Sequence, residues 1–231
     1  MLETLFLLEE KKQNYFLLAL LGLVAGLTGF SIARIIFPSQ ADLISVLFAA
    51  VPLIYSLASK FLDDEAEKLP HLPEVEIYLS IFAGQALAFG LLSSVFTESF
   101  QIQKSVLGST GAAIQGGNFQ FILTNNLTVF SSIFLVSLLV GSAGAFILSW
   151  NASVFGVFMS KIFSSDPVLS LAYLPHSLFE MSGFVIAGIS GSLISAAVYR
   201  KHFDKDTWKD YIKLVVAGIT CIIIGATLEA A

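Results

Sequence analysis

The chain has 231 residues, of which 56% are hydrophobic and 13% are charged, and its net charge is −5. A soluble domain has about twice this fraction of charged residues, so much of the surface must contact lipid. No basic run is typical of a nucleic-acid-binding surface, and we do not expect nucleic acid as a partner.

Six apolar windows are long enough to cross a membrane as helices, because a hydrocarbon core of about 30 Å needs roughly 20 residues. In chain order these windows are 15–37, 41–61, 75–96, 121–150, 168–198 and 211–228. None alternates strictly between apolar and polar residues, which argues against a membrane β-barrel. The sequence therefore predicts an all-α, polytopic transmembrane helix bundle that forms one integral domain over residues 1–231, multi-pass in the cell membrane.

The connections between the windows differ in character. Residues 63–76 are rich in Asp and Glu and predict a solvated acidic loop. Residues 101–120 are rich in Gly, Gln and Ser, and they predict a flexible connection too polar to span. Residues 200–213 form the most basic loop, which bears on orientation because cytoplasmic loops carry an excess of Lys and Arg.

The six windows alone divide the basic residues almost evenly between the two sides of the membrane. The short apolar stretch 152–163 offers an extra half-helix or crossing, and with it Lys11, Lys12 and the basic loop share the cytoplasmic side. The fifth window is also longer than one crossing requires and contains Pro175, which breaks or kinks a helix. We therefore expect an irregular element near residues 152–180.

Small residues recur at four-residue spacing, as in the pairs Gly22 and Gly26 and Gly183 and Ala187. Such spacing lets two membrane helices approach closely. The pattern fits packing within one subunit, and it also fits a face for a homodimer.

Glu180 is the acidic residue that lies deepest in an apolar window. A carboxylate inside a membrane is expensive, so its side chain should face protein or water and have a partner. His176 lies four residues earlier, on the same face of a helix. The pair could lock a kink behind Pro175 as a structural hydrogen bond, form a substrate, ion or proton-relay site, or take part in catalysis.

Three asparagines flank the fourth window, Asn125 and Asn126 at its start and Asn151 at its end. Asparagines near a membrane interface cap helices, and at depth they bond to neighbouring helices. If the fourth and fifth windows pack together, Asn125 or Asn126 can reach Glu180. The candidate polar intramembrane cluster is therefore Asn125, Asn126, Asn151, Pro175, His176 and Glu180.

The sequence gives little support for catalysis. His176 and Glu180 supply two ligands, whereas a catalytic zinc usually has three protein ligands. The nucleophile-elbow and phosphate-binding glycine motifs are absent from the sequence. We therefore expect no metal, no cofactor and no catalytic residue, and we predict that the protein is not an enzyme.

Residues 119 to the C-terminus resemble the stage II sporulation protein M (SpoIIM-like) family, in particular its small archaeal-type members. The resemblance rests on Asn125-Asn126 before a long span, Asn151 followed by Gly156, and the stretches 175–180 and 187–191. The Pro-His-x-x-x-Glu core of 175–180 is its most specific part. The first half of the chain resembles the family in hydropathy.

This resemblance implies a non-enzymatic membrane scaffold or assembly factor, because the namesake of the family is a scaffold for peptidoglycan-degrading partners. A small transporter or channel subunit with a polar site around His176 and Glu180 is the alternative. Polar pairs sealed by packing would favour a scaffold, whereas a water-connected polar track would favour transport. The expected partners are the lipid bilayer and either other membrane proteins or further copies of the chain.

Overall fold

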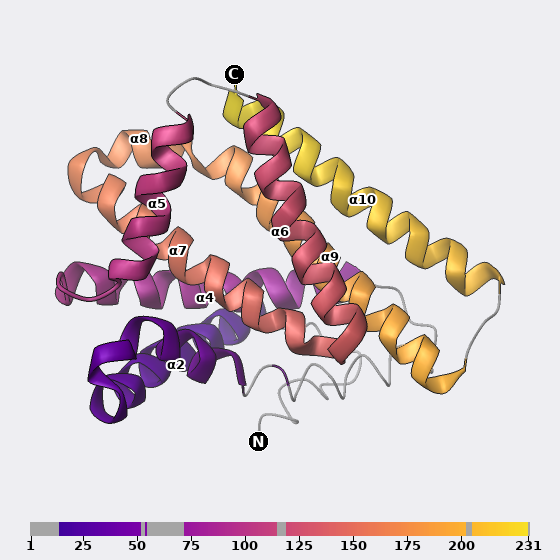
Figure 1. Ribbon diagram of the computed structural model, residues 1–231, viewed down its shortest axis with the longest axis horizontal. Helices are drawn as coiled ribbons and strands as arrows, with labels where there is room; N and C mark the ends of the chain where they lie inside the picture. Colours follow the sequence, from indigo (N-terminus) through magenta and orange to yellow (C-terminus); the bar gives the residue numbers. More distant parts are fainter. Residues whose placement is uncertain (1–13, 52–53, 55–71, 115–118, 202–204, 231) are drawn as a thin grey trace.

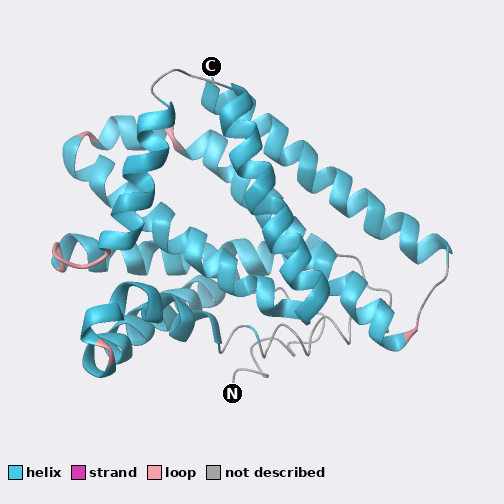
Figure 2. Ribbon diagram, in the orientation of Figure 1, coloured by secondary structure: helices cyan, strands magenta, loops and turns pink. Residues whose placement is uncertain are grey.

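The structure is a computed structural model that describes residues 14–51, 54, 72–114, 119–201 and 205–230. The regular secondary structure of these residues is helical throughout (Figure 2), and the helices pack against one another along their lengths. The predicted all-α helix bundle is therefore confirmed.

The first and third apolar windows form long helices, α2 over Tyr15–Ile36 and α4 over Leu72–Val95. The short 3-10 helix η1, Pro38–Gln40, follows α2 and leads into a helical segment at 41–51. The rest of the second window, except Ile54, lies outside the described residues. The predicted acidic loop also lies mostly outside them, and its last residues, 72–76, belong to α4.

Glycines bring α2 and α4 into close contact. A Cβ atom on Gly22 would overlap the carbonyl oxygen of Ile81, and one on Gly26 would lie 2.6 Å from the Cβ of Ala88. The residue further along α2 contacts the residue further along α4, so the two helices run parallel. The small residues of α2 therefore serve packing within one subunit, the first of the two uses that the spacing allowed.

The predicted flexible connection at 101–120 is wrong in its first part, because residues Gln101–Ile114 form helix α5. Asp42 stabilises the start of this helix. Its two carboxylate oxygens accept hydrogen bonds from the backbone N–H groups of Phe100 and Gln101, each at 2.7 Å. This cap from a distant part of the chain leaves no local sequence signal.

The prediction of one span over 121–150 is also wrong. Helix α6, Phe119–Val140, ends at the 3-10 turn η2, Gly141–Ala143, and helix α7 continues over Gly144–Ser165. Gly141 has φ +64°, a left-handed conformation that interrupts the helix and that glycine adopts without strain. The stretch 152–163 is therefore part of a full-length helix rather than of a short insertion.

The fifth window breaks as the sequence predicts. Helix α8 covers Pro167–Ala172 and helix α9 covers Leu174–Arg200, with Tyr173 between them. Pro175 stands in the first turn of α9, where its missing N–H disrupts no hydrogen bond. The sixth window forms the last helix, α10, over Lys205–Ala230. The predicted basic loop at 200–213 is therefore wrong in its second part, because residues 205–213 are the first turns of α10.

Helix α9 is the centre of the bundle and the most buried of the long helices. It packs between α6 and α10, and α6, α9 and α10 lie side by side in Figure 1. Asn126 contacts Glu180 near the start of both α6 and α9, while Phe134 meets Gly191 further along, so these two helices run parallel.

Helix α10 runs antiparallel to α9. Gly225, near the end of α10, lies against Glu180, near the start of α9, whereas Gly218 lies against Ile186. A Cβ atom on Gly225 would lie 2.5 Å from Cγ of Glu180, and one on Gly218 would lie 3.0 Å from Ile186 of α9 and 2.7 Å from Phe130 of α6. Glycine thus sets the distance between the last two long helices.

The other long helices can be oriented in the same way. Helix α7 runs antiparallel to α9, because Leu148 lies near Gly188 and Phe158 packs edge-on against Tyr173, the residue before α9. Helix α7 runs parallel to α4, since Ile81 and Leu148 line one cavity and Gly90 contacts Gly156 further along. Consequently α2, α4, α7 and α10 begin at the end of the bundle where α9 finishes. We call this the basic end, and the other the opposite end.

Five apolar segments among the described residues are long enough to cross a membrane: Tyr15–Ile36, Val75–Val95, Phe119–Ser165, Leu174–Arg200 and Lys205–Ala230. The third has 47 residues and contains both α6 and α7. As helix it would extend about 70 Å, more than twice a hydrocarbon core, which is why it folds back at η2.

Candidate functional site: a polar cluster joining three helices

Two buried polar side chains meet near the opposite end of the bundle. Asn126 on α6 is 7% exposed and Glu180 on α9 is 8% exposed. The Nδ2 group of Asn126 donates a hydrogen bond to Oε1 of Glu180 at 2.5 Å. The Nδ2 group of Asn125 in turn donates to Oδ1 of Asn126 at 3.3 Å. A chain of side-chain hydrogen bonds therefore leads from Asn125 to the buried carboxyl group.

The close approach of α6 and α9 places this pair. A Cβ atom on Gly191 would lie 2.5 Å from the carbonyl oxygen of Phe134, so only glycine allows the two backbones to come so near. Because the helices run parallel, the same approach brings Asn126 opposite Glu180. Glu180 therefore lies inside the bundle, where the cost of an intramembrane carboxylate led us to expect it.

Helix α10 closes the third side of the cluster. A Cβ atom on Gly225 would lie 2.5 Å from Cγ of Glu180 and 3.2 Å from the carbonyl oxygen of His176. Glu229 follows Gly225 by four residues on the same face of α10, which places its side chain beside Glu180 and His176. The cluster thus joins α6, α9 and α10 through polar groups.

Glu229 is the residue that the sequence analysis missed, because it lies near the end of the last apolar window. The signal was present in the spacing of α10. Gly218, Ile222 and Gly225 are buried on one face of this helix, and Glu229 follows Gly225 by four residues. A helix places residues at such intervals on one side, which predicts that Glu229 faces α9.

His176 lies beside the cluster but is not the hydrogen-bond partner that we expected for Glu180. The ring of His176 packs edge-on against Tyr173, with the ring centroids 5.6 Å apart. Tyr173 packs in the same way against Phe158 of α7, at 5.2 Å. The imidazole therefore belongs to the aromatic contact at the break between α8 and α9, whereas the Glu180 carboxyl group is bonded by Asn126.

The two other predicted cluster residues have local roles. The Nδ2 group of Asn151 donates to the carbonyl oxygen of Ile147 at 2.8 Å, within helix α7. Pro175 is exposed in the first turn of α9. Asn125, Asn126 and Glu180 are thus joined by hydrogen bonds, His176 lies beside them, and neither Asn151 nor Pro175 has a polar contact with them.

The cluster is shallower than the sequence suggested. Glu180 lies in the middle of the window 168–198, but α9 begins only at Leu174 because α8 is a separate helix. Glu180 is therefore six residues, or about 9 Å, from the start of α9. This depth places the carboxyl group between the centre of the bundle and its opposite end.

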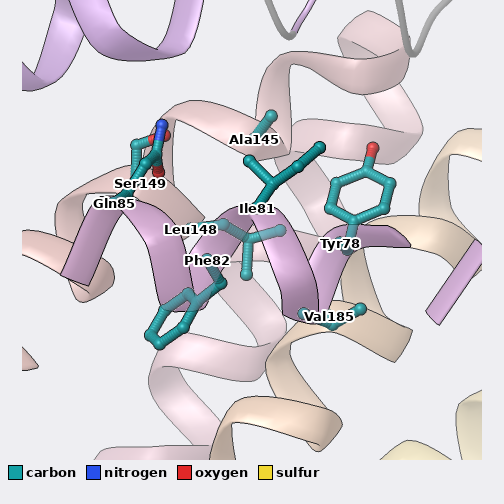
Figure 3. Close-up of a pocket in the computed structure, with 8 residues that line it drawn as sticks. All are labelled: Tyr78, Ile81, Phe82, Gln85, Ala145, Leu148, Ser149 and Val185. Carbon is teal, nitrogen blue, oxygen red and sulfur yellow. The ribbon is translucent and has the colours of Figure 1, made fainter. Parts of the chain in front are cut away.

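A small cavity lies elsewhere in the bundle, between α4, α7 and α9 (Figure 3). It measures about 20 Å³ and is lined by Tyr78, Ile81, Phe82, Gln85, Ala145, Leu148, Ser149 and Val185. The Nε2 group of Gln85 donates to the carbonyl oxygen of Ala49 at 3.3 Å. The volume suits about one water molecule. No cavity-lining residue belongs to the polar cluster.

Among the described residues, no three His, Cys, Asp or Glu side chains are arranged to hold a metal ion. What the arrangement around Glu180 can do chemically is link three helices through polar groups.

The helices and their buried polar cluster define a helical membrane protein. The stage II sporulation protein M family matches residues 15–231, so the chain belongs to this family. The match includes the first half of the chain, for which the sequence analysis had only hydropathy as a guide. An uncharacterized protein of Methanocaldococcus jannaschii is 32% identical over 122 residues, which cover 48% of this chain and 68% of that protein. No solved structure matches the chain significantly.

Proposed function

We propose that the chain is a non-enzymatic scaffold or assembly factor, multi-pass in the cell membrane, that holds membrane-protein partners through its helices and short loops. The observation that carries the proposal is the packing around Glu180. Asn126 of α6 donates a hydrogen bond to one carboxyl oxygen of Glu180, and Gly225 of α10 lies so close to Glu180 that even a Cβ atom would not fit. A carboxyl group enclosed in this way links helices and leaves little room for a passing solute.

The separation of the polar groups supports the same function. The cavity beside Gln85 is large enough for about one water molecule and shares no residue with the cluster at Glu180. A transport path would need polar groups connected by water across the bundle. Sealed and separate polar groups are what we expected of a scaffold.

Exposed apolar side chains supply surfaces for partners within the membrane. Leu139 on α6 is 78% exposed and Ile35 on α2 is 81% exposed. These side chains meet lipid when the protein is alone. A partner helix that packs against one of them would replace lipid with protein contacts, which membrane helices achieve through close packing rather than a hydrophobic driving force.

Two measurements on the full chain test the proposed function. A photo-cross-linking amino acid at Leu139 or Ile35, in native membranes, should give discrete protein adducts from one face and mainly lipid from the other. The purified protein in liposomes should pass ions and protons no faster than empty liposomes. Flux that Glu180→Gln abolishes would overturn the proposal, and so would lipid adducts alone from both faces.

The alternative function is a transporter or channel subunit. It is favoured by one observation, the presence of two carboxyl groups and an imidazole beside one another at Glu180, Glu229 and His176. Ionisable groups within membrane helices often mark proton or ion paths. The liposome measurement separates this function from the scaffold, because only a transporter gives flux that depends on Glu180.

A further inference from the structure

We propose that the cavity between α4, α7 and α9 is a binding site for one water molecule, which joins Gln85 of α4 to Ser149 of α7. The site shares no residue with the cluster at Glu180. The proposal goes beyond the scaffold role and does not rest on it, because it concerns a ligand held between helices of this chain.

The first step of the argument is the hydroxyl group of Ser149. This side chain lines the cavity, is 2% exposed and makes no hydrogen bond with any residue that the structure describes. By contrast Ser153, one turn further along α7, donates to the carbonyl oxygen of Trp150 at 2.8 Å. A buried hydroxyl group without a partner costs free energy, so Ser149 requires a partner in the cavity that it lines.

The second step concerns the amide group of Gln85. This side chain is also 2% exposed, and its Nε2 group donates to the carbonyl oxygen of Ala49. An amide has two donor hydrogens and an acceptor oxygen, so one N–H and the oxygen have no partner among the described residues. Figure 3 shows the polar ends of Gln85 and Ser149 close together, with the hydroxyl group of Tyr78 pointing away from them.

The third step is the choice of ligand. A cavity of about 20 Å³ has room for one water molecule, and a buried water makes about three hydrogen bonds. The hydroxyl group of Ser149 with the second N–H and the oxygen of Gln85 supply this number. Hard cations such as Mg²⁺ and Ca²⁺ bind roughly six or more oxygen ligands, which these two side chains do not provide. The site therefore suits a small neutral ligand that both donates and accepts hydrogen bonds.

The position of the site gives the water a structural effect. Gln85 stands near the middle of α4, where lipid cannot satisfy a polar group. Through the bond from Gln85 to Ala49, the water connects α7 and α4 to the helical segment at 41–51. The cluster at Glu180 links α6, α9 and α10. The bound water thus joins elements that this cluster does not reach.

Hydroxyl-radical footprinting of the full chain in lipid nanodiscs tests the site. Radicals that an X-ray pulse generates from a bound water react with the side chains around it, so a buried ring beside the water is hydroxylated. Phe82 lines the cavity and is 7% exposed, whereas Phe130 and Phe184 are 4% and 2% exposed and do not line it. We expect several-fold more hydroxylation of Phe82 than of either control ring.

Two substitutions assign this reactivity to the polar side chains. Ser149→Ala and Gln85→Leu each remove hydrogen bonds to the water, so each should lower the hydroxylation of Phe82 toward that of the control rings in the same sample. Gln85→Leu also loses the bond to Ala49. If that variant does not fold, Ser149→Ala decides alone.

Ser153→Ala is the matched control variant. Ser153 is as buried as Ser149 and lies on the same helix, but it accepts a hydrogen bond from Gln103 and does not line the cavity. Its substitution should leave the hydroxylation of Phe82 unchanged. The proposal is overturned if Phe82 of the wild type is no more reactive than the control rings. It is also overturned if Ser149→Ala leaves this reactivity unchanged, or if Ser153→Ala lowers it equally.

Discussion

Glu180 shows how a membrane bundle accommodates a carboxyl group. Placing an acidic side chain at the centre of a membrane helix costs about 2.5–3.5 kcal/mol on insertion scales, and hydrogen bonds to charged groups contribute roughly 1.5–3 kcal/mol. The bond from Asn126 is therefore of the size needed to offset the cost. The same bond fixes the register of α6 and α9.

Substitutions of Glu180 should show separately how its hydrogen bond and its charge contribute to the stability of the protein. Glu180→Gln keeps an acceptor for Asn126, so we expect thermal unfolding in detergent close to that of the wild type. Glu180→Leu leaves the Asn126 amide buried without an acceptor and should destabilise the protein by about 1–3 kcal/mol. The double variant Asn126→Leu, Glu180→Leu should recover part of this loss, since both polar partners are then replaced. A fully stable Glu180→Leu variant would contradict the structural role.

Gly225 should be equally sensitive, for a steric reason. Gly225→Ala places a Cβ atom 2.5 Å from Cγ of Glu180 and should destabilise the protein by about 1–3 kcal/mol. Thr227→Ala is a matched control, because Thr227 is exposed on the same helix and should change the stability by less than about 0.5 kcal/mol. Equal unfolding temperatures for the two variants would show that α10 moves away at little cost.

At this scale the sequence identified part of the site. Glu180 and the two asparagines stand out because polar residues are rare in apolar windows. Glu229 does not, because acidic residues near helix ends are common and only the buried face of α10 distinguishes it. The sequence also could not identify the hydrogen-bond partner of Glu180, because both His176 and Asn126 were candidates. Only the packing of α6 on α9 shows that the partner is Asn126.

Among the elements, the helix breaks were the hardest features to predict. The windows that became α2, α4 and α10 are bounded by polar residues or proline, so these helices are readable from hydropathy. Helix α4 nevertheless begins three residues before its window, and α10 begins six residues before its own. The break at Gly141 lies inside an uninterrupted apolar stretch, and a single glycine there resembles the many packing glycines of the chain. Helix α5 depends on Asp42, a cap that is 59 residues distant from Gln101.

The turn at Gly141 gives a test that involves backbone conformation alone. A Cβ atom on Gly141 meets nothing within 4 Å, but its φ of +64° is unfavourable for most residues. Gly141→Ala should therefore destabilise the protein by about 1–2 kcal/mol. Gly141→Asn should cost less, because asparagine visits this conformation more readily. Thermal unfolding of both variants checks the order, and a more stable alanine variant would argue against a left-handed turn.

At the scale of the whole molecule, the helix directions bear on orientation in the membrane. Tyr15, where α2 begins, hydrogen-bonds to Glu76 near the start of α4, and Arg200 ends α9 at the same end of the bundle. The basic loop therefore lies at the end from which the chain enters α2. This arrangement agrees with the extra crossing that α7 provides.

We predict that the N-terminus and the basic segment 200–213, which includes the start of α10, both face the cytoplasm, following the distribution of Lys and Arg. Cysteine replacements at Gln13 and Asp206 in a Cys221→Ser background can be labelled in intact cells and in inverted vesicles. An impermeant reagent should reach both positions only in the inverted vesicles. Labelling of the two positions from different sides would contradict the helix directions, and labelling of both in intact cells would reverse the orientation.

The contact between Asn126 and Glu180 has a consequence for biosynthesis. The two residues are 54 positions apart, with α7 and α8 between them. At about 5–20 residues per second, the ribosome makes Glu180 roughly 3–11 s after Asn126. During this interval α6 is in the membrane without the helix that satisfies its amide. The nascent chain therefore passes through a stage in which a membrane insertase or another protein can bind α6 where α9 later packs.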